Sequence, residues 1–203
     1  MRGTEIIILI EGYLKIISEN RCRASGTIVL VRDNGKNILV DTGNPKDKDK
    51  IVQALKKQGL APDDIDFVII THFHSDHVGC NYLFSKARFV TPPVAFWNDI
   101  FERDEGFQKI SDNIKIIATP GHTEDGVTVL VKTESGITAI VGDLFWSEED
   151  LKIELQKKDC SNLKLFYKNR DKILKIADWI IPGHGKMFKV KNKNSIQNTR
   201  KYA

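Results

Sequence analysis

The stretch Thr71-His72-Phe73-His74-Ser75-Asp76-His77-Val78-Gly79 places three imidazoles and a carboxylate within six positions. The apolar run Phe67-Val68-Ile69-Ile70 comes directly before it and predicts a buried β-strand. Because side chains alternate along the start of the turn, His72 and His74 point to the same side, whereas Asp76 and His77 can point to a second, neighbouring site. A solvated polar turn would not need so many potential ligands. The stretch therefore predicts two neighbouring metal ions that share this turn and take further ligands from elsewhere in the chain.

The remaining histidines have the same setting, because all five in the chain lie in turns directly after apolar strands. His122 follows Pro120-Gly121 and His184 follows Pro182-Gly183, and a Pro-Gly pair aims the next side chain off the strand end. Asp143 ends another strand. Two close cations repel, so an anionic bridge is required, and this carboxylate is placed to supply it. Five imidazoles and two carboxylates suit zinc, and also iron or manganese.

Composition gives the broad class. The chain has 203 residues, 41% hydrophobic and 29% charged, which is typical of one soluble globular domain. We expect this domain over residues 1–190 and a loose basic tail over residues 191–203. The net charge of +4 does not by itself indicate nucleic-acid binding. The three cysteines predict no disulfide framework, and Cys80 is expected to be a small buried residue rather than a ligand. We find no targeting signal or membrane span and expect a cytoplasmic location.

The periodicity of the chain predicts two packed β-sheets with helices outside. We expect strands over residues 4–17, 26–31, 36–40, 65–71, 87–91, 114–118, 127–133 and 138–141, and helices over residues 48–58, 78–84 and 161–177. Asn34-Gly35 is a strong hairpin signal. Residues 18–25 are predicted to be a polar loop, and residues 92–112 an irregular region that serves either as a lid or as a partner surface.

Taken together, the His-x-His-x-Asp-His run, the later Pro-Gly-His, the Gly-Asp and the final Pro-Gly-His-Gly resemble the metallo-β-lactamase superfamily. The resemblance implies an α/β (α+β) fold, the four-layer αββα sandwich of that superfamily. It also implies roles for individual residues: His72, His74 and His122 for the first metal, Asp76, His77 and His184 for the second, Asp143 as the bridge, and Asp41 as the carboxylate that orients the metal-binding turn.

Within the superfamily, the C-terminal half is most similar to the compact group around metallo-β-lactamase-domain-containing protein 1. The likeness rests on Gly142-Asp143-Leu144-Phe145, Asn169-Arg170 and the run from Ile176 to Gly185. The other branches fit less well. True β-lactamases generally lack the bridging Asp, flavodiiron proteins have Glu in place of His74, and glyoxalase II and the larger nucleases carry additional domains.

These patterns predict a dinuclear metal-dependent hydrolase in which a metal-bridging hydroxide attacks a small ester, thioester or lactone-like substrate, with Asp76 as a ligand and proton acceptor. Three alternatives remain. They are a phosphodiesterase or ribonuclease of the same fold, a non-heme iron redox protein, and a metal-stabilised binding module. Either a small molecule or RNA is the expected substrate, no membrane partner is expected, and a homodimer is a candidate assembly. Arg21, Arg23 and Lys46 either meet an anionic substrate or are solvated, and Phe145 and Trp146 either wall the cleft or pack in the core.

Overall fold

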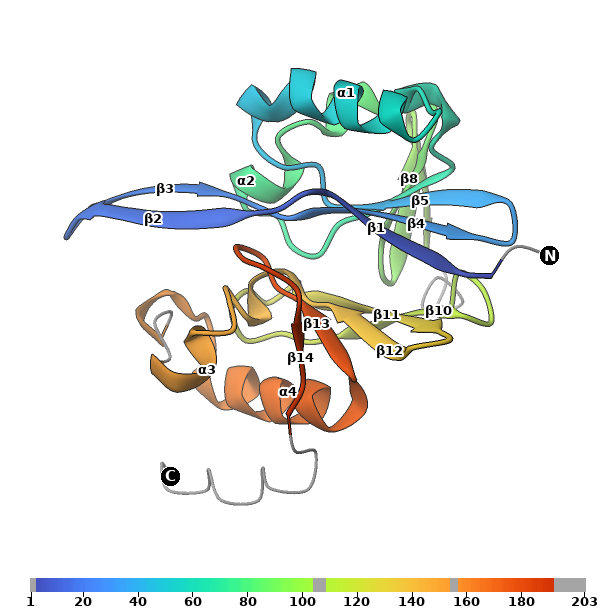
Figure 1. Ribbon diagram of the computed structural model, residues 1–203. Coiled ribbons are helices and arrows are strands. Elements are labelled where there is room, and N and C mark those ends of the chain that lie inside the picture. Colours follow the sequence, from blue (N-terminus) through green and yellow to red (C-terminus); the bar gives the residue numbers. More distant parts are fainter. Residues whose placement is uncertain (1–2, 104–108, 154–156, 192–203) are drawn as a thin grey trace.

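The computed structural model describes residues 3–103, 109–153 and 157–191. Two β-sheets lie face to face in the middle of the molecule, with helix α1 (Lys48–Lys57) outside one sheet and helix α4 (Leu163–Ile176) outside the other (Figure 1). These four layers confirm the predicted αββα sandwich. The predicted basic tail lies outside the described residues, apart from its first residue.

The larger sheet has seven strands. In spatial order they are β1 (Glu5–Ile10), β4 (Ile28–Asp33), β5 (Lys36–Val40), β6 (Phe67–Ile69), β7 (Arg88–Thr91), β8 (Val94–Trp97) and β9 (Ile100–Arg103). The smaller sheet has five, in the order β10 (Ile114–Ala118), β11 (Val127–Thr133), β12 (Gly136–Ile140), β13 (Trp179–Ile181) and β14 (Phe188–Lys189). A third sheet is the hairpin of β2 (Tyr13–Ser18) and β3 (Arg21–Ser25), which projects from the sandwich (Figure 1).

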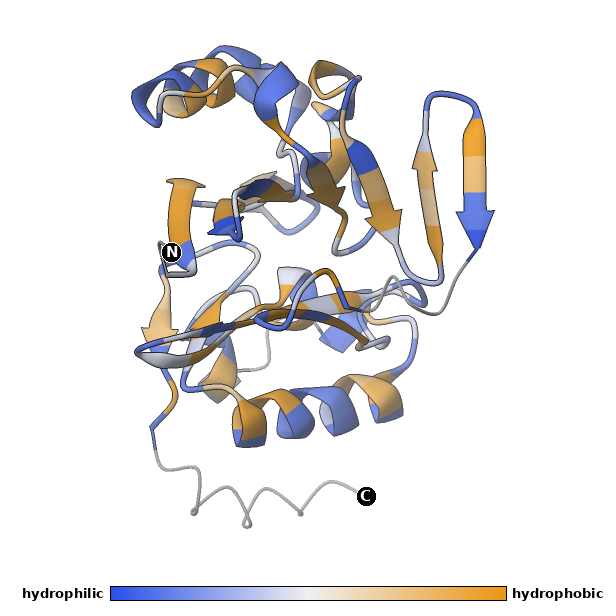
Figure 2. Cartoon of the chain, turned by 90° about the vertical axis from the view of Figure 1, so that its right-hand side faces the viewer, coloured by the Kyte–Doolittle hydropathy of each residue, from blue (hydrophilic) through white to orange (hydrophobic). Residues whose placement is uncertain are grey.

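The sandwich is held by three apolar clusters, one in each space between layers. Strand β4 shows why: Val29 and Val31 belong to the cluster between the sheets, whereas Ile28 and Leu30 belong to the cluster under α1. All four are fully buried. Side chains of a strand alternate between its faces, so a strand with both faces covered reads as a continuous apolar run. Figure 2 accordingly shows the strands of both sheets mainly as hydrophobic.

The two outer helices follow their predicted bounds closely. In α1 the buried residues are Ile51 and Leu55, and the chain leaves the helix through Gly59, whose φ of 73° suits glycine. In α4 the Asn162 side chain accepts a hydrogen bond from Leu165 N at 3.0 Å and caps the first turn. Among the described residues, no helix is long and apolar enough to cross a membrane.

The topology brings the functional turns to one edge. Strands β5, β6 and β7 are parallel to one another, and so are β12 and β13. Strand β10 runs in the same direction as β12, because both are antiparallel to β11. The turns that follow β5, β6, β10, β12 and β13 carry Asp41, the His72–His77 run, His122, Asp143 and His184. Side chains that are far apart in the sequence therefore meet at this edge.

Three local predictions were wrong. Residues 18–25 are not a loop throughout, because residues 21–25 form β3 and pair with β2. The region 92–112 is not irregular throughout, because β8 and β9 extend the larger sheet from residue 94 to residue 103; residues 104–108 lie outside the described part. The helix expected over residues 78–84 is displaced: α2 spans Ser75–Val78, and a 3₁₀ turn follows at Asn81–Leu83.

Candidate metal centre

Two groups of side chains with metal-ligating atoms meet at the strand-end edge. The first group consists of His72, His74, His122 and Asp143, and the second group consists of Asp76, His77 and His184. Within each group, one potential ligand atom per residue lies within 4.8 Å of the others. The structure therefore brings together all seven residues that the sequence suggested as ligands.

Asp143 lies between the two groups. Its Oδ1 is 3.2 Å from Nε2 of His77 and 3.1 Å from Nε2 of His184. Its Oδ2 is 3.4 Å from Nε2 of His122 and 3.8 Å from Nε2 of His72. One carboxylate thus faces both groups, which is the placement that a bridging ligand requires.

The short helix α2 separates the two groups along the chain. It begins directly after His74, so Asp76 and His77 lie on α2 whereas His72 and His74 precede it, and the rings of His72 and His77 are nevertheless neighbours, with centroids 4.2 Å apart. His77 is fully buried and Asp76 is partly buried, whereas His74 is exposed. Within the second group, His77 is therefore shielded from solvent, whereas Asp76 is accessible to it.

Asp41 orients one histidine of the second group. Its Oδ1 accepts a hydrogen bond from Thr71 N at 2.7 Å, and its Oδ2 accepts from Thr71 Oγ1 at 2.6 Å. Nδ1 of His77 lies 2.7 Å from the same Oδ2 and donates its proton there. Nε2 of His77 consequently faces Asp143 and is the nitrogen that a metal would bind in place of a proton, as in other carboxylate–histidine–metal arrangements.

Thr71 orients a histidine of the first group, a role that the sequence did not suggest. Its hydroxyl proton goes to Asp41, so its oxygen accepts from Nδ1 of His72, which lies 3.1 Å away. His72 is therefore held in the tautomer that leaves Nε2 free. His184 is fixed in the same way, because its Nδ1 donates to the carbonyl oxygen of Ser25 at 3.0 Å.

Two glycines in the motifs are required by close approach. A Cβ on Gly183 would lie 2.0 Å from Oδ1 of Asp143, and a Cβ on Gly142 would lie 2.5 Å from Oγ1 of Thr71. Gly142 also has a φ of 52°, which favours glycine. The Gly-Asp and Pro-Gly-His motifs thus allow their two turns to pack directly against the side chains of the centre.

The two aromatic residues after Asp143 have different roles. Phe145 is fully buried in the cluster under α4 and is an ordinary core residue. Trp146 is partly exposed, and its indole Nε1 donates to Oδ2 of Asp143 at 3.1 Å. Its ring centroid lies 6.4 Å from the rings of His122 and His184. Trp146 therefore forms one wall of the centre.

The loop that carries Asp143 and Trp146 is supported from below by Arg170 of α4. This buried guanidinium donates to Oδ2 of Asp150 at 2.7 Å and to the carbonyl oxygen of Leu144 at 3.2 Å. Oδ2 of Asp150 in turn accepts from Trp146 N at 3.3 Å. Arg170 of the Asn169-Arg170 pair thus has a structural role behind the site, and only the structure reveals it.

The pKa values of the buried histidines are shifted in opposite directions in the two groups. Burial lowers the pKa of His72 and of His122. Burial acts in the same direction on His77 and His184, but Asp143 outweighs it, with Asp41 also acting on His77, and their pKa values are raised. For Asp143 burial would raise the pKa, but His77 and His184 hold it well below its usual value. Asp143 is therefore ionised, as a metal ligand must be.

The donor set fits divalent cations. Among the described residues, buried atoms that make no well-formed hydrogen bond include Nε2 of His72, Nε2 of His77 and Oδ1 of Asp143, although the last two lie at an ion-pair distance of 3.2 Å. Leaving such an atom unsatisfied costs about 1–3 kcal/mol, more if it is charged. These three atoms all point into the centre, and imidazole and carboxylate are common ligands of zinc, iron and manganese. Cations held there would satisfy all three atoms at once.

Comparison with known proteins gives the family of the chain. The family model of the metallo-beta-lactamase superfamily matches residues 23–95. A metallo-beta-lactamase domain-containing protein 1 from Xenopus laevis is 35% identical over 196 residues, covering 90% of this chain and 80% of the relative. The chain belongs to the metallo-β-lactamase superfamily. A probable metallo-hydrolase from Methanocaldococcus jannaschii is 36% identical over 157 residues, covering 76% of this chain and 74% of that protein.

A solved structure also matches in fold. An N-acyl homoserine lactone hydrolase with its product bound has a TM-score of 0.64 at 16% identity, over 91% of this chain and 93% of that one. Family membership together with the His/Asp cluster makes the chain a metal-dependent hydrolase. The predicted similarity to the metallo-beta-lactamase domain-containing protein 1 group is also confirmed.

Proposed function

We propose that the chain is a dinuclear metallohydrolase that acts on small ester, thioester or lactone-like substrates, with zinc as the metal. The placement of Asp143 carries the proposal, because one ionised carboxylate faces both ligand groups within hydrogen-bonding or ion-pairing distance. The first group would hold one cation, the second group another, and Asp143 would contribute to both. The lactone hydrolase of the same fold makes cyclic esters the first substrates to try.

A bound pair of cations supplies a water of lowered pKa and polarises the oxygen of the electrophile. The residues of the chain orient the ligands and accept the proton of the attacking water. Asp41, Thr71 and the carbonyl of Ser25 hold the histidine rings in the required tautomers. Asp76, with a side chain 18% exposed compared with 5% for Asp143, can accept the proton of the attacking water and pass it to solvent.

Trp146 shapes the substrate side of the centre. Because its indole N–H is used by Asp143, the ring itself is left to contact the substrate. An aromatic wall beside a polar centre favours substrates with an apolar group next to the scissile carbonyl. This preference separates acyl substrates from compact phosphate esters.

The proposal is tested by metal analysis and a substrate panel on the full-length protein. We expect about two zinc ions per chain and hydrolysis of a lactone, a thioester or an aryl ester. Asp143→Ala should abolish this hydrolysis. Asp49→Ala, at an exposed position of α1, should leave it intact. One metal per chain at saturating zinc would refute the dinuclear centre. A fully loaded protein that is inactive on all three acyl classes would refute the substrate assignment.

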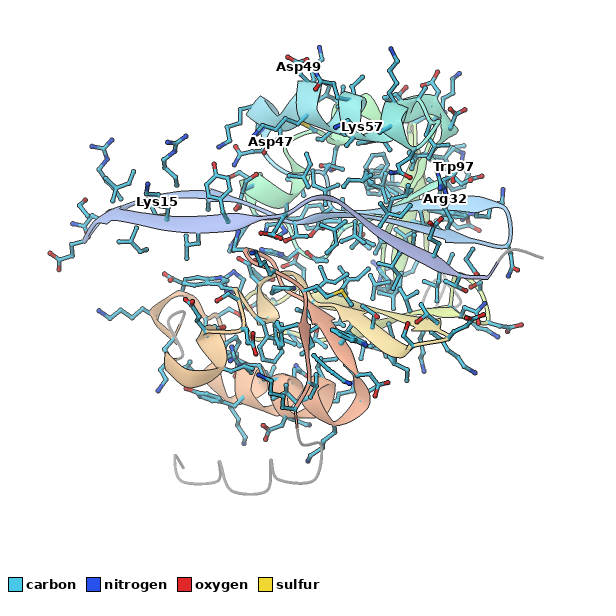
Figure 3. The ribbon with its side chains drawn as sticks, viewed as in Figure 1. Lys15, Arg32, Asp47, Asp49, Lys57 and Trp97 are labelled. Atoms are coloured by element: carbon cyan, nitrogen blue, oxygen red, sulfur yellow. The ribbon has the colours of Figure 1, made fainter. Side chains whose placement is uncertain are left out.

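Phosphodiester cleavage is a second candidate, favoured by the β2–β3 hairpin. Lys15 lies directly opposite Arg23 in the hairpin, and Arg21 is one alternation further along the same face. Figure 3 shows Lys15 on the hairpin, away from the body of the sandwich. Like charges directly opposite each other are destabilising, and in the described part of the chain none of the three has an acidic partner. A polyanion such as RNA would relieve this repulsion.

Charge reversal distinguishes the two candidates. If the hairpin guides RNA, Arg21→Glu/Arg23→Glu should slow cleavage of single-stranded RNA and weaken its salt-dependent binding, without changing hydrolysis of a neutral ester. Arg103→Glu, on the distant edge strand β9, is the matched control. Equal effects of the two variants would remove the support for a phosphodiesterase.

A further inference from the structure

The root of the projecting hairpin, residues 25–27, is hydrogen-bonded to the two chain segments that carry the second ligand group. Ser25 O accepts from Nδ1 of His184 at 3.0 Å. Gly26 N donates to the carbonyl oxygen of Asp76 at 3.0 Å. Thr27 donates to the carbonyl oxygen of Gly183 twice, through N at 2.8 Å and through Oγ1 at 3.0 Å. Three consecutive residues therefore hold both chain segments that supply the second group.

The hairpin root also packs closely against the second group. A Cβ on Gly26 would lie 2.8 Å from the carbonyl oxygen of Asp76 and 2.8 Å from the ring of His77. In the described part of the chain, no hydrogen bond of residues 25–27 reaches the histidines of the first group. The hairpin root thus acts on one of the two groups selectively.

Asp47 fixes this root. It is 1% exposed, and its Oδ2 accepts from Oγ of Ser25 at 2.5 Å and from Asn44 N at 3.3 Å. Its Oδ1 is 3.4 Å from Nζ of Lys50, which is itself exposed. Figure 3 shows Asp47 on the side of α1 that faces the strands and Asp49 on the outer side. Neither the sequence motifs nor the mechanism above uses this buried carboxylate.

A chain of hydrogen bonds therefore runs from Asp47 through Ser25 to His184. The carboxylate holds the Ser25 side chain, and the carbonyl of the same residue fixes the His184 ring. A carbonyl oxygen can only accept, so Nδ1 of His184 must carry the proton and Nε2 is presented to the centre. Outer partners of this kind set the orientation and basicity of a metal-binding histidine, and losing one costs about 10–100-fold in metal affinity.

We propose that Asp47 is a positioning residue for the second ligand group, acting through Ser25 on the orientation of His184. The effect on metal binding rests on the proposed function, since it requires a cation in the second group. The orientation of His184 does not, because the contacts that fix it, from Nδ1 to Ser25 O and from Ser25 Oγ to Asp47, are made by the chain itself. The two claims can therefore be tested separately.

The experiment follows the five histidines individually. Long-range ¹H–¹⁵N spectra of the labelled full-length protein report the proton on each ring nitrogen, first without metal and then during a zinc titration. The variants are Ser25→Ala, Asp47→Ala, Asp47→Asn and the exposed control Asp49→Ala. Asp47→Asn retains an oxygen that can accept from Ser25, so it should partly restore what Asp47→Ala removes.

In the metal-free protein we expect a protected Nδ1 proton on His184, lost or rapidly exchanging in Asp47→Ala and Ser25→Ala. On titration, the zinc that shifts His184 should bind about tenfold more weakly in both variants, while the zinc that shifts His122 binds as in the wild type. The double variant Ser25→Ala/Asp47→Ala should bind this zinc no more weakly than either single variant, because the two residues act in series. If Asp47→Ala fails to fold, Ser25→Ala alone decides the question.

An unchanged His184 proton in the variants would overturn the proposal, as would equal weakening of both zinc ions or fully additive effects. If the wild type binds a single zinc ion, the dinuclear function fails, and the positioning role is then decided by the metal-free spectra alone.

Discussion

The substitution Gly183→Ala tests the geometry of the centre most directly. Gly183 does not have a positive φ, so alanine is compatible with its backbone. The added methyl carbon, however, would lie 2.0 Å from Oδ1 of Asp143, about 1.4 Å short of ordinary contact at 3.4 Å. It would also lie 3.0 Å from the backbone of Gly142. The clash is therefore with the carboxylate that both ligand groups share.

Asp143 cannot move farther into the centre, because its Oδ1 is already 3.2 Å and 3.1 Å from Nε2 of His77 and His184. It must turn away from both groups by about 1 Å, and a misplacement of this size costs on the order of 100-fold in rate. At about 1.4 kcal/mol per factor of ten, this is roughly 3 kcal/mol of transition-state stabilisation. The cost in folding free energy is smaller, about 1–3 kcal/mol for an overpacked site.

The assay combines zinc titration, kcat/KM on the best acyl substrate and urea unfolding of the metal-free protein. Both zinc affinities should fall together, unlike the selective loss expected for Asp47→Ala. Gly3→Ala is the control, because no atom lies within 4 Å of its added Cβ. A Gly183→Ala protein with wild-type zinc affinity and kcat/KM would refute the reasoning, since Asp143 could then not be the shared ligand in the geometry described.

Three further predictions concern stability and pH. Arg170→Met should lower the free energy of unfolding, measured by urea denaturation, by about 3–5 kcal/mol, because it removes the buried cation that Asp150 binds. A loss below about 1 kcal/mol would contradict this role of Arg170. Chelation by EDTA should lower the melting temperature, since a metal at 1,000 times its Kd stabilises the folded state by about 4 kcal/mol; identical melting curves would argue against a metal centre. Zinc binding near neutral pH should release protons, because the pKa values of His77 and His184 are raised without metal. In the metal-free protein, the ion pairs of His77 and His184 with Asp143 contribute fully to stability below the unfolded histidine pKa of about 6.5. This contribution is lost as the pH rises through the raised pKa values of the two histidines. Zinc affinity increases over the same pH range. Calorimetry in buffers of different ionisation enthalpy measures the release, and a buffer-independent enthalpy would contradict it.

Much of the fold was predictable because the buried strands are apolar on both faces. The hairpin strand β3 was missed for the opposite reason. Its residues Arg21, Cys22 and Arg23 are all exposed, so no burial pattern marks them as a strand. Strands β8 and β9 were missed because Pro92-Pro93 signals a break, and the pairing that continues the sheet beyond it depends on backbone hydrogen bonds with β7. Hydrophobic patterning detects burial, and these strands lie at the margins of the core.

The cluster from Thr71 to Gly79, with His122, Asp143 and His184, was determined by the sequence alone, because ligand chemistry is a property of residue type and a strand end can be read locally. The sequence could also suggest Asp41. It could not show that His184 is oriented by Ser25, 159 positions away, or that Asp47 holds Ser25 in place. It likewise could not separate Trp146, which contacts Asp143, from Phe145, which is core. Each of these contacts depends on how the two sheets pack and which atoms then come within hydrogen-bonding distance, and only the tertiary structure decides that.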